Sequence, residues 1–167
     1  MKKLAFMMGA ALLLEGCTHA ISRDLLNQSR NIPFDQLQAD PDLHKGVLVI
    51  LGGTITTTTI EQRATLIEVM QKSLDKWGRP LRTARSGGTF FVRYAGTLDT
   101  MVYGPDREIT VAGLVEGSLR PGRDGPGVAY PVVLSKELKL WPREPASWSR
   151  QQYLDPLYER NGSPLQY

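Results

Sequence analysis

The segment from Glu108 to Glu116 repeats with a period of two residues, and this pattern limits the fold more than any other feature of the chain. The residues on one parity are Ile109, Val111, Gly113 and Val115. A period of two places alternate side chains on opposite faces of an extended chain, whereas a helix repeats about every 3.6 residues. The segment is therefore predicted to be a β-strand.

Four further segments have the composition of strands, and each is bounded by glycine, proline or polar residues. They cover residues 65–70, 89–94, 128–140 and 47–60, the last with a bulge or bend at Gly52-Gly53. Proline at position 131 indicates an edge position or a bulge in the last strand, because proline cannot donate to a sheet ladder.

Residues between the expected strands favour turns. Gly104-Pro105-Asp106 predicts a tight turn, and residues 117–127 predict a long hairpin loop. Asp99 is expected to be a turn residue that accepts a backbone hydrogen bond. A short helical turn is expected over residues 35–43, before the first strand.

Five consecutive strands with short connections predict an all-β domain. Closure into a barrel removes the exposed edges that an open sheet would leave. We therefore expect a small five-stranded OB-like barrel over residues 33–141, with a β-sandwich as the alternative. The tail, residues 142–167, is rich in proline and aromatic residues and is expected to pack on the barrel or to contact a partner or a membrane interface.

The counts of cysteine and histidine exclude several kinds of site. The 167 residues include one cysteine, Cys17, and two histidines, His19 and His44. An intramolecular disulfide is impossible, and a zinc site would need nearly every nitrogen and sulfur ligand in the chain. Neither histidine is expected beside a nucleophile on a rigid scaffold. We therefore predict no enzymatic activity, no catalytic residue, no metal and no dissociable cofactor.

The formal net charge argues against one class of partner. It is +3 for the whole chain, and the basic residues form no clustered stripe. A nucleic-acid-binding domain would be expected to have a larger and more concentrated positive charge. Nucleic acid is therefore not expected as a partner.

The beginning of the chain has the pattern of an export signal. Lys2 and Lys3 precede an uncharged, apolar run of eleven residues, 4–14. A membrane-spanning helix needs about 20 apolar residues, so the run fits the core of a cleaved signal peptide over residues 1–16. The run ends in Leu14-Glu15-Gly16-Cys17, which resembles the lipobox of bacterial lipoproteins. This resemblance implies cleavage before Cys17 and a lipid joined to its sulfur.

The residues after the cysteine suggest the destination and spacing of the domain. Thr18 stands where an aspartate commonly retains lipoproteins in the inner membrane, so the outer membrane is favoured. Residues 17–32 are mostly polar, and we expect them to form a lipidated, flexible tether. A coil of that length would span on the order of 20 Å.

A series of short motifs follows one order along the expected barrel. They are Gly46-Val47-Leu48-Val49 with Gly52-Gly53, Thr65-Leu66-Ile67-Glu68-Val69, Gly78-Arg79-Pro80, Gly96-Thr97-Leu98-Asp99 with Tyr103, Arg107-Glu108-Ile109-Thr110-Val111-Ala112-Gly113, and Tyr130-Pro131-Val132 running to Leu140-Trp141. In this order they resemble the Slp family of starvation-inducible outer-membrane lipoproteins. The resemblance implies a Gram-negative outer-membrane lipoprotein that is linked to stationary phase and stress and has no assigned reaction.

Two functional hypotheses follow. The first is a non-enzymatic envelope component that is anchored through Cys17 and faces the periplasm. The alternative is a periplasmic binding module for an envelope glycan, lipid or protein, since OB-like barrels often bind ligands on one face. The candidate ligand-binding residues are Arg82, Arg85, Arg93, Tyr94 and Tyr103. Ordinary solubilising surface is the competing interpretation of the arginines.

Overall fold

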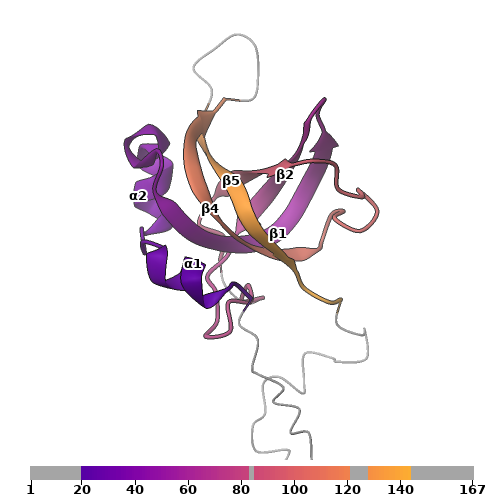
Figure 1. Cartoon of the computed structure of the whole chain (residues 1–167), viewed down its shortest axis with the longest axis horizontal. Helices are drawn as coiled ribbons and strands as arrows, with labels where there is room; N and C mark the ends of the chain where they lie inside the picture. Colours follow the sequence, from indigo (N-terminus) through magenta and orange to yellow (C-terminus); the bar gives the residue numbers. More distant parts are fainter. Residues whose placement is uncertain (1–19, 83–84, 121–127, 144–167) are drawn as a thin grey trace, which may run out of the picture.

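Five strands close into a barrel in the order β1-β2-β3-β5-β4, with β4 pairing back to β1 (Figure 1). The computed structural model describes residues 20–82, 85–120 and 128–143. The strands are β1 (Leu48–Ile60), β2 (Ala64–Gln71), β3 (Thr89–Ala95), β4 (Glu108–Leu119) and β5 (Tyr130–Leu140). Before them come α1 (Arg23–Gln28), α2 (Phe34–Ala39) and the 3-10 turn η1 (Pro41–His44).

The pairing of the strands confirms the predicted small barrel. β3 and β5 pair in parallel, and the other neighbouring strands are antiparallel. Each strand therefore has two partners, and the β-sandwich alternative is wrong. The helical turn expected before the first strand is also confirmed, as α2 and η1.

The barrel interior is filled by every second residue of the strands. Ile67, Val69, Phe90 and Val92 have no exposed surface, and they come from the neighbouring strands β2 and β3. Leu37 of α2 is equally buried in the same core. Thus the period of two in the sequence identifies the inner faces, and α2 contributes to the core from outside the sheet.

The paired glycines of β1 lie where the strand changes partners. β1 pairs with β4 from Leu48 to Thr54 and with β2 from Gly53 to Ile60. A Cβ on Gly53 would overlap the carbonyl oxygen of Met70 on β2, so only glycine allows this close approach of the two backbones. The bend expected at these glycines fits this changeover, but the shift of register lies further along, between Ile55 and Thr57.

We expect Gly53→Ala to lower the free energy of unfolding by about 2 to 3 kcal/mol, because a backbone carbonyl cannot move aside as a side chain can. Gly46→Ala is the matched control. Gly46 has φ +79°, and no atom lies within 4 Å of the place that an added Cβ would take, so its cost is conformational only. That cost is about 1 kcal/mol. Denaturant unfolding measures both, and an equal loss in the two variants would contradict the steric explanation.

The second half of the sheet differs from expectation at the end of β4. This strand continues through Gly117 to Leu119, so the predicted loop begins later than residue 117, and residues 121–127 lie outside the described part. The register shifts between Val115 and Gly117, next to the pair formed by Ser118 and Pro131. Pro131 therefore lies beside a bulge, which is one of the two positions expected for it. On the other side of β5 the pairing with β3 runs only from Val132 to Leu134, so Pro131 lies outside that ladder.

η1 is fastened to the end of β4 through Asp42. Its carboxylate lies 2.9 Å from the Lys45 ammonium and accepts hydrogen bonds from the Ser118 hydroxyl and amide at 3.0 and 3.3 Å. The hydrogen bond from Lys45 and then that from Ser118 lower the pKa of Asp42. This contact stabilises the fold above the unfolded-state pKa and is lost as the pH falls through the lowered one.

The segment before the barrel is not the flexible coil that its polar composition suggested. Ala20 and Ile21 are only 5% and 2% exposed, and they form a buried cluster with Ala112 of β4. α1 follows, and the Arg30 amide donates to the Leu48 carbonyl at 2.8 Å. The scattered aliphatic residues of the segment cover the outside of the barrel, so the tether prediction is wrong for residues 20–31. Residues 1–19 and 144–167 lie outside the described part.

Candidate functional site

The arginines predicted to bind a ligand do not gather into one basic patch. Arg82 and Arg85 lie between β2 and β3, and the Arg82 Nε donates to the Glu108 carboxylate at 3.1 Å. Arg93 lies in β3 and donates to Glu116 at 2.9 Å. The two glutamates are eight residues apart on β4, about 26 Å along an extended strand. Arg82 and Arg93 therefore belong to different ends of the barrel.

The predicted tyrosines do not share one surface with Arg93. Tyr94 is the next residue in β3, so its side chain points to the opposite face of the strand, and Tyr103 is a partly buried residue against the core. The Tyr103 carbonyl accepts a hydrogen bond from the Thr58 hydroxyl at 2.5 Å, which ties its turn to β1. Arg93 also donates to Glu61 at 2.6 Å. The polar groups at this end thus fasten elements of the barrel to one another.

Asp99 has the local role that was predicted for it. Its carboxylate accepts the Met101 amide at 2.8 Å, and its carbonyl accepts the Val102 and Tyr103 amides. The turn prediction at Gly104-Pro105-Asp106 is also confirmed, because the Arg107 amide donates to the Gly104 carbonyl.

A partly buried ion pair joins the loop after β2 to the first residue of β4. Arg79 Nη2 and Nε donate to one oxygen of Glu108 at 2.8 and 3.0 Å, and the other oxygen accepts from Arg82. The side chains of Glu108 and Arg79 are only 12% and 24% exposed, whereas that of Arg82 is 60% exposed. Since burial limits screening, the pair with Arg79 is the stronger of the two.

Trp141, just after β5, covers this ion pair. Its ring lies 5.5 Å from the Arg79 guanidinium, and its indole N–H donates to the Thr110 hydroxyl at 3.0 Å. The Thr110 hydroxyl in turn donates to the Gly78 carbonyl at 2.6 Å. Thr110 has no exposed surface, and a buried hydroxyl needs hydrogen-bond partners within the protein. The Trp141 indole and the Gly78 carbonyl are these partners. We call Arg79, Glu108, Thr110 and Trp141 the Arg79–Trp141 cluster.

The amino-terminal segment docks beside this cluster. The Ala20 amide donates to the Trp77 carbonyl at 3.2 Å. The Ser22 amide donates to both carboxylate oxygens of Glu137 on β5, at 3.1 and 3.2 Å. Ile21 is buried between these two anchor points, in an apolar cluster that Trp141 also contacts. The first described residues are therefore held on the outside of the barrel, next to the loop after β2.

The sequence alone does not identify the Arg79–Trp141 cluster as a site. The residues of the cluster nevertheless belong to motifs that are visible in the sequence. Arg79 lies in Gly78-Arg79-Pro80, Glu108 and Thr110 lie in the motif that ends at Gly113, and Trp141 ends the last motif. The structure brings these three motifs together. The order of the motifs along the chain indicated the family resemblance, but it did not indicate which residues would be in contact.

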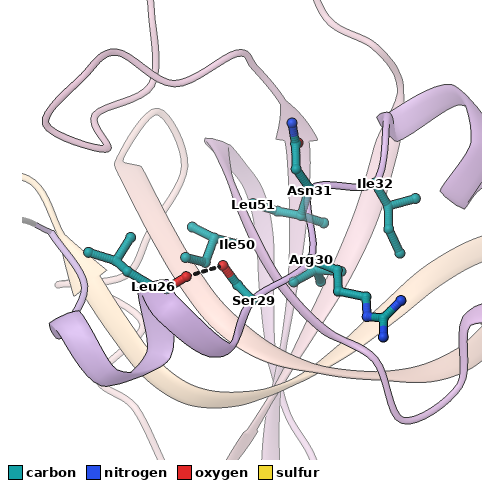
Figure 2. A pocket seen from close by; sticks show the side chains of 8 residues that line it. Leu26, Ser29, Arg30, Asn31, Ile32, Ile50 and Leu51 are labelled. Atoms are coloured by element: carbon teal, nitrogen blue, oxygen red, sulfur yellow. Dashed lines mark hydrogen bonds between the residues drawn. The ribbon is translucent and has the colours of Figure 1, made fainter.

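A shallow hollow lies between the segment after α1 and β1 (Figure 2). Its volume is about 300 Å³, and it is lined by residues 26, 29–32 and 49–51. The Ser29 hydroxyl is engaged with the Leu26 carbonyl at 2.8 Å, and the guanidinium of Arg30 points away from that hydrogen bond. The lining residues include no carboxylate and no histidine, so their chemistry suits packing more than proton transfer.

Neither a metal-ligand group nor a membrane-spanning helix occurs among the described residues. In the part of the chain that the structure describes, no three or more His, Cys, Asp or Glu side chains group as metal ligands. No helix within those ranges is sufficiently long and apolar to cross a bilayer.

Comparison with protein families gives a match over almost the whole chain. The model of the Outer membrane lipoprotein Slp family matches residues 14–166. The match begins at the leucine of the lipobox-like motif and includes all the strands of the barrel. No curated protein matches the chain.

Proposed function

We propose, because this chain belongs to the Slp family of outer membrane lipoproteins of Gram-negative bacteria, that Cys17 carries its lipid anchor. Cys17 is the only cysteine, and it directly follows Leu14-Glu15-Gly16, where the family match begins. That coincidence is the observation on which the proposal depends. Each buried lipid methylene contributes about 0.8 kcal/mol, so an anchor with more than one acyl chain holds the protein stably on the bilayer.

We further propose that the barrel is a non-enzymatic envelope component that faces the periplasm and serves under stationary-phase stress. The ionised groups at the Arg79–Trp141 cluster support this role, because they bind one another and connect the loop after β2 with β4 and β5. At the other end, Arg93 connects β3 to β4 in the same way. These side chains hold the scaffold together, as expected for a structural component.

The test is metabolic labelling with a palmitate analogue in a Gram-negative host. We expect the wild-type chain to be labelled and to sediment with outer membranes, and Cys17→Ser to lose both properties because the acceptor thiol is absent. Glu15→Ala is the matched control, since it changes the variable position of the motif and keeps the thiol. Continued labelling of Cys17→Ser would contradict the proposal.

The orientation is tested on the same labelled cells. Protease added to intact cells is expected to spare the protein, and protease added after permeabilisation of the outer membrane is expected to degrade it. Degradation in intact cells would overturn the periplasmic orientation while leaving the lipid anchor in place.

A further inference from the structure

The structure restricts where a lipid on Cys17 can lie relative to the barrel. Ala20 is fixed on the barrel, and only two residues separate it from Cys17. An extended chain covers at most about 3.6 Å per residue, so the Cα atom of Cys17 lies within roughly 11 Å of that of Ala20 along any path. The docked segment therefore allows no long spacer between the lipid and the barrel.

The loop after β2 presents an aromatic and cationic surface at this point. The Ala20 amide donates a hydrogen bond to the Trp77 carbonyl, and Trp77 is 43% exposed. The Lys76 ammonium lies 5.0 Å from the Trp77 ring. The carboxylate of the neighbouring Asp75 accepts the amides of Trp77 and Arg79, which fixes the shape of the loop.

The end of β5 extends the same surface. Lys139 is exposed, and its ammonium lies 5.9 Å from the ring of Trp141. Trp141 is joined through the Thr110 hydroxyl to the Gly78 carbonyl, next to Trp77. The acidic residues beside this surface include Asp75, whose carboxylate accepts the Trp77 and Arg79 amides, and Glu137, whose carboxylate accepts the Ser22 amide. We call Lys76, Trp77, Lys139 and Trp141 the basal face.

We infer that the basal face rests on the headgroups of the bilayer that holds the lipid, with Trp77 at the boundary between headgroups and acyl chains. This inference depends on the proposed lipidation of Cys17 for its geometry. Tryptophan favours the membrane interface because its ring is apolar and its N–H is polar. Lysines beside it match anionic headgroups, and their stems can lie along the apolar layer.

The opposite end of the barrel is then directed away from the membrane. The turn between β1 and β2, residues 61–63, is separated from the loop after β2 by the eight residues of β2. That length corresponds to about 26 Å. Figure 1 shows the β1–β2 turn and the loop after β2 at opposite ends of the barrel. Gln62, which is exposed in that turn, provides a matched reference position.

The experiment uses the lipidated full-length chain in vesicles of phosphatidylethanolamine and phosphatidylglycerol. Because lipid occupies Cys17, an introduced cysteine can be labelled uniquely with a nitroxide, in Trp77→Cys, Lys76→Cys or Gln62→Cys. Electron paramagnetic resonance then compares access of oxygen, which enters the bilayer, with access of a water-soluble nickel complex. We expect the ratio of oxygen to nickel access to be several-fold higher at positions 76 and 77 than at 62.

Each outcome decides the inference. Equal ratios at 76, 77 and 62 would overturn it, as would loss of access to both reagents at 76 and 77, which would indicate a protein partner on the basal face. Lys76→Cys keeps Trp77 and tests the face if Trp77→Cys fails to fold. Mass spectrometry of the same samples reports the lipid on Cys17. A lipidated protein with a water-exposed position 77 therefore refutes the docking alone, and an unlipidated protein refutes the proposed function.

Discussion

Replacement of Phe90 by alanine is expected to lower the free energy of unfolding by about 4 kcal/mol, within the usual range for an aromatic ring removed from a core. Phe90 is fully buried in the barrel, and its ring meets that of Phe34 from α2 edge-on, with 6.1 Å between centroids. The substitution removes contacts with the sheet and with α2 together. The change is measured by denaturant unfolding, as a lower midpoint with an unchanged slope.

Phe91→Ala is the matched control for this prediction. Phe91 is the next residue in β3 and points to the opposite face, where its ring packs edge-on against Tyr130 at 5.8 Å. Phe91 is 8% exposed and does not belong to the core cluster of the barrel interior, so we expect a smaller loss of about 3 kcal/mol, at the lower end of the range for such a substitution. A loss at Phe91 equal to that at Phe90 would contradict the assignment of β3's inner and outer faces.

Replacement of Glu108 by alanine is expected to cost about 3 kcal/mol of unfolding free energy, because the partly buried Arg79 guanidinium loses two hydrogen bonds to a carboxylate. Arg79, under the ring of Trp141, is the charge left behind, whereas the exposed Arg82 can turn to water. Denaturant unfolding at low and moderate salt measures the loss.

Glu116→Ala tests whether burial causes this effect. Glu116 also pairs with an arginine, Arg93, and lies on the same strand as Glu108, but its side chain is 35% exposed. Exposed ion pairs contribute about 0.2 to 1 kcal/mol, and salt weakens them. We expect a loss below about 1 kcal/mol that shrinks further with salt. Equal losses for Glu108→Ala and Glu116→Ala would show that burial does not distinguish the two pairs.

The strands could be predicted because each carries its own period of two. Residues 109–115 identify the inner face of β4 without reference to any other part of the chain. The turn at Asp99 was equally predictable, since its carboxylate bonds to an amide two residues away. Local chemistry determines such features, and a sequence presents local chemistry directly.

The partners of the strands and of the charged residues could not be predicted in the same way. β3 pairs with β5 rather than with β4, although β4 follows it in the chain. Arg82 and Arg93 are near each other in sequence, yet they bind glutamates at different ends of β4. The polar composition of residues 20–31 also concealed that Ile21 packs on Ala112. All of these contacts arise between distant segments and depend on how the barrel closes.

The contact between the Ser22 amide and Glu137 has a kinetic consequence. The two residues are 115 positions apart, and Glu137 faces Ala112 only when β5 has paired with β4. Contacts at such separation form late, since the chain entropy of a long loop must first be overcome. The amino-terminal segment is synthesised first, but we expect it to dock on the barrel only after β5 has paired with β4. During that interval the lipid-bearing end that we propose remains on an unfastened chain, within reach of the enzymes that modify it.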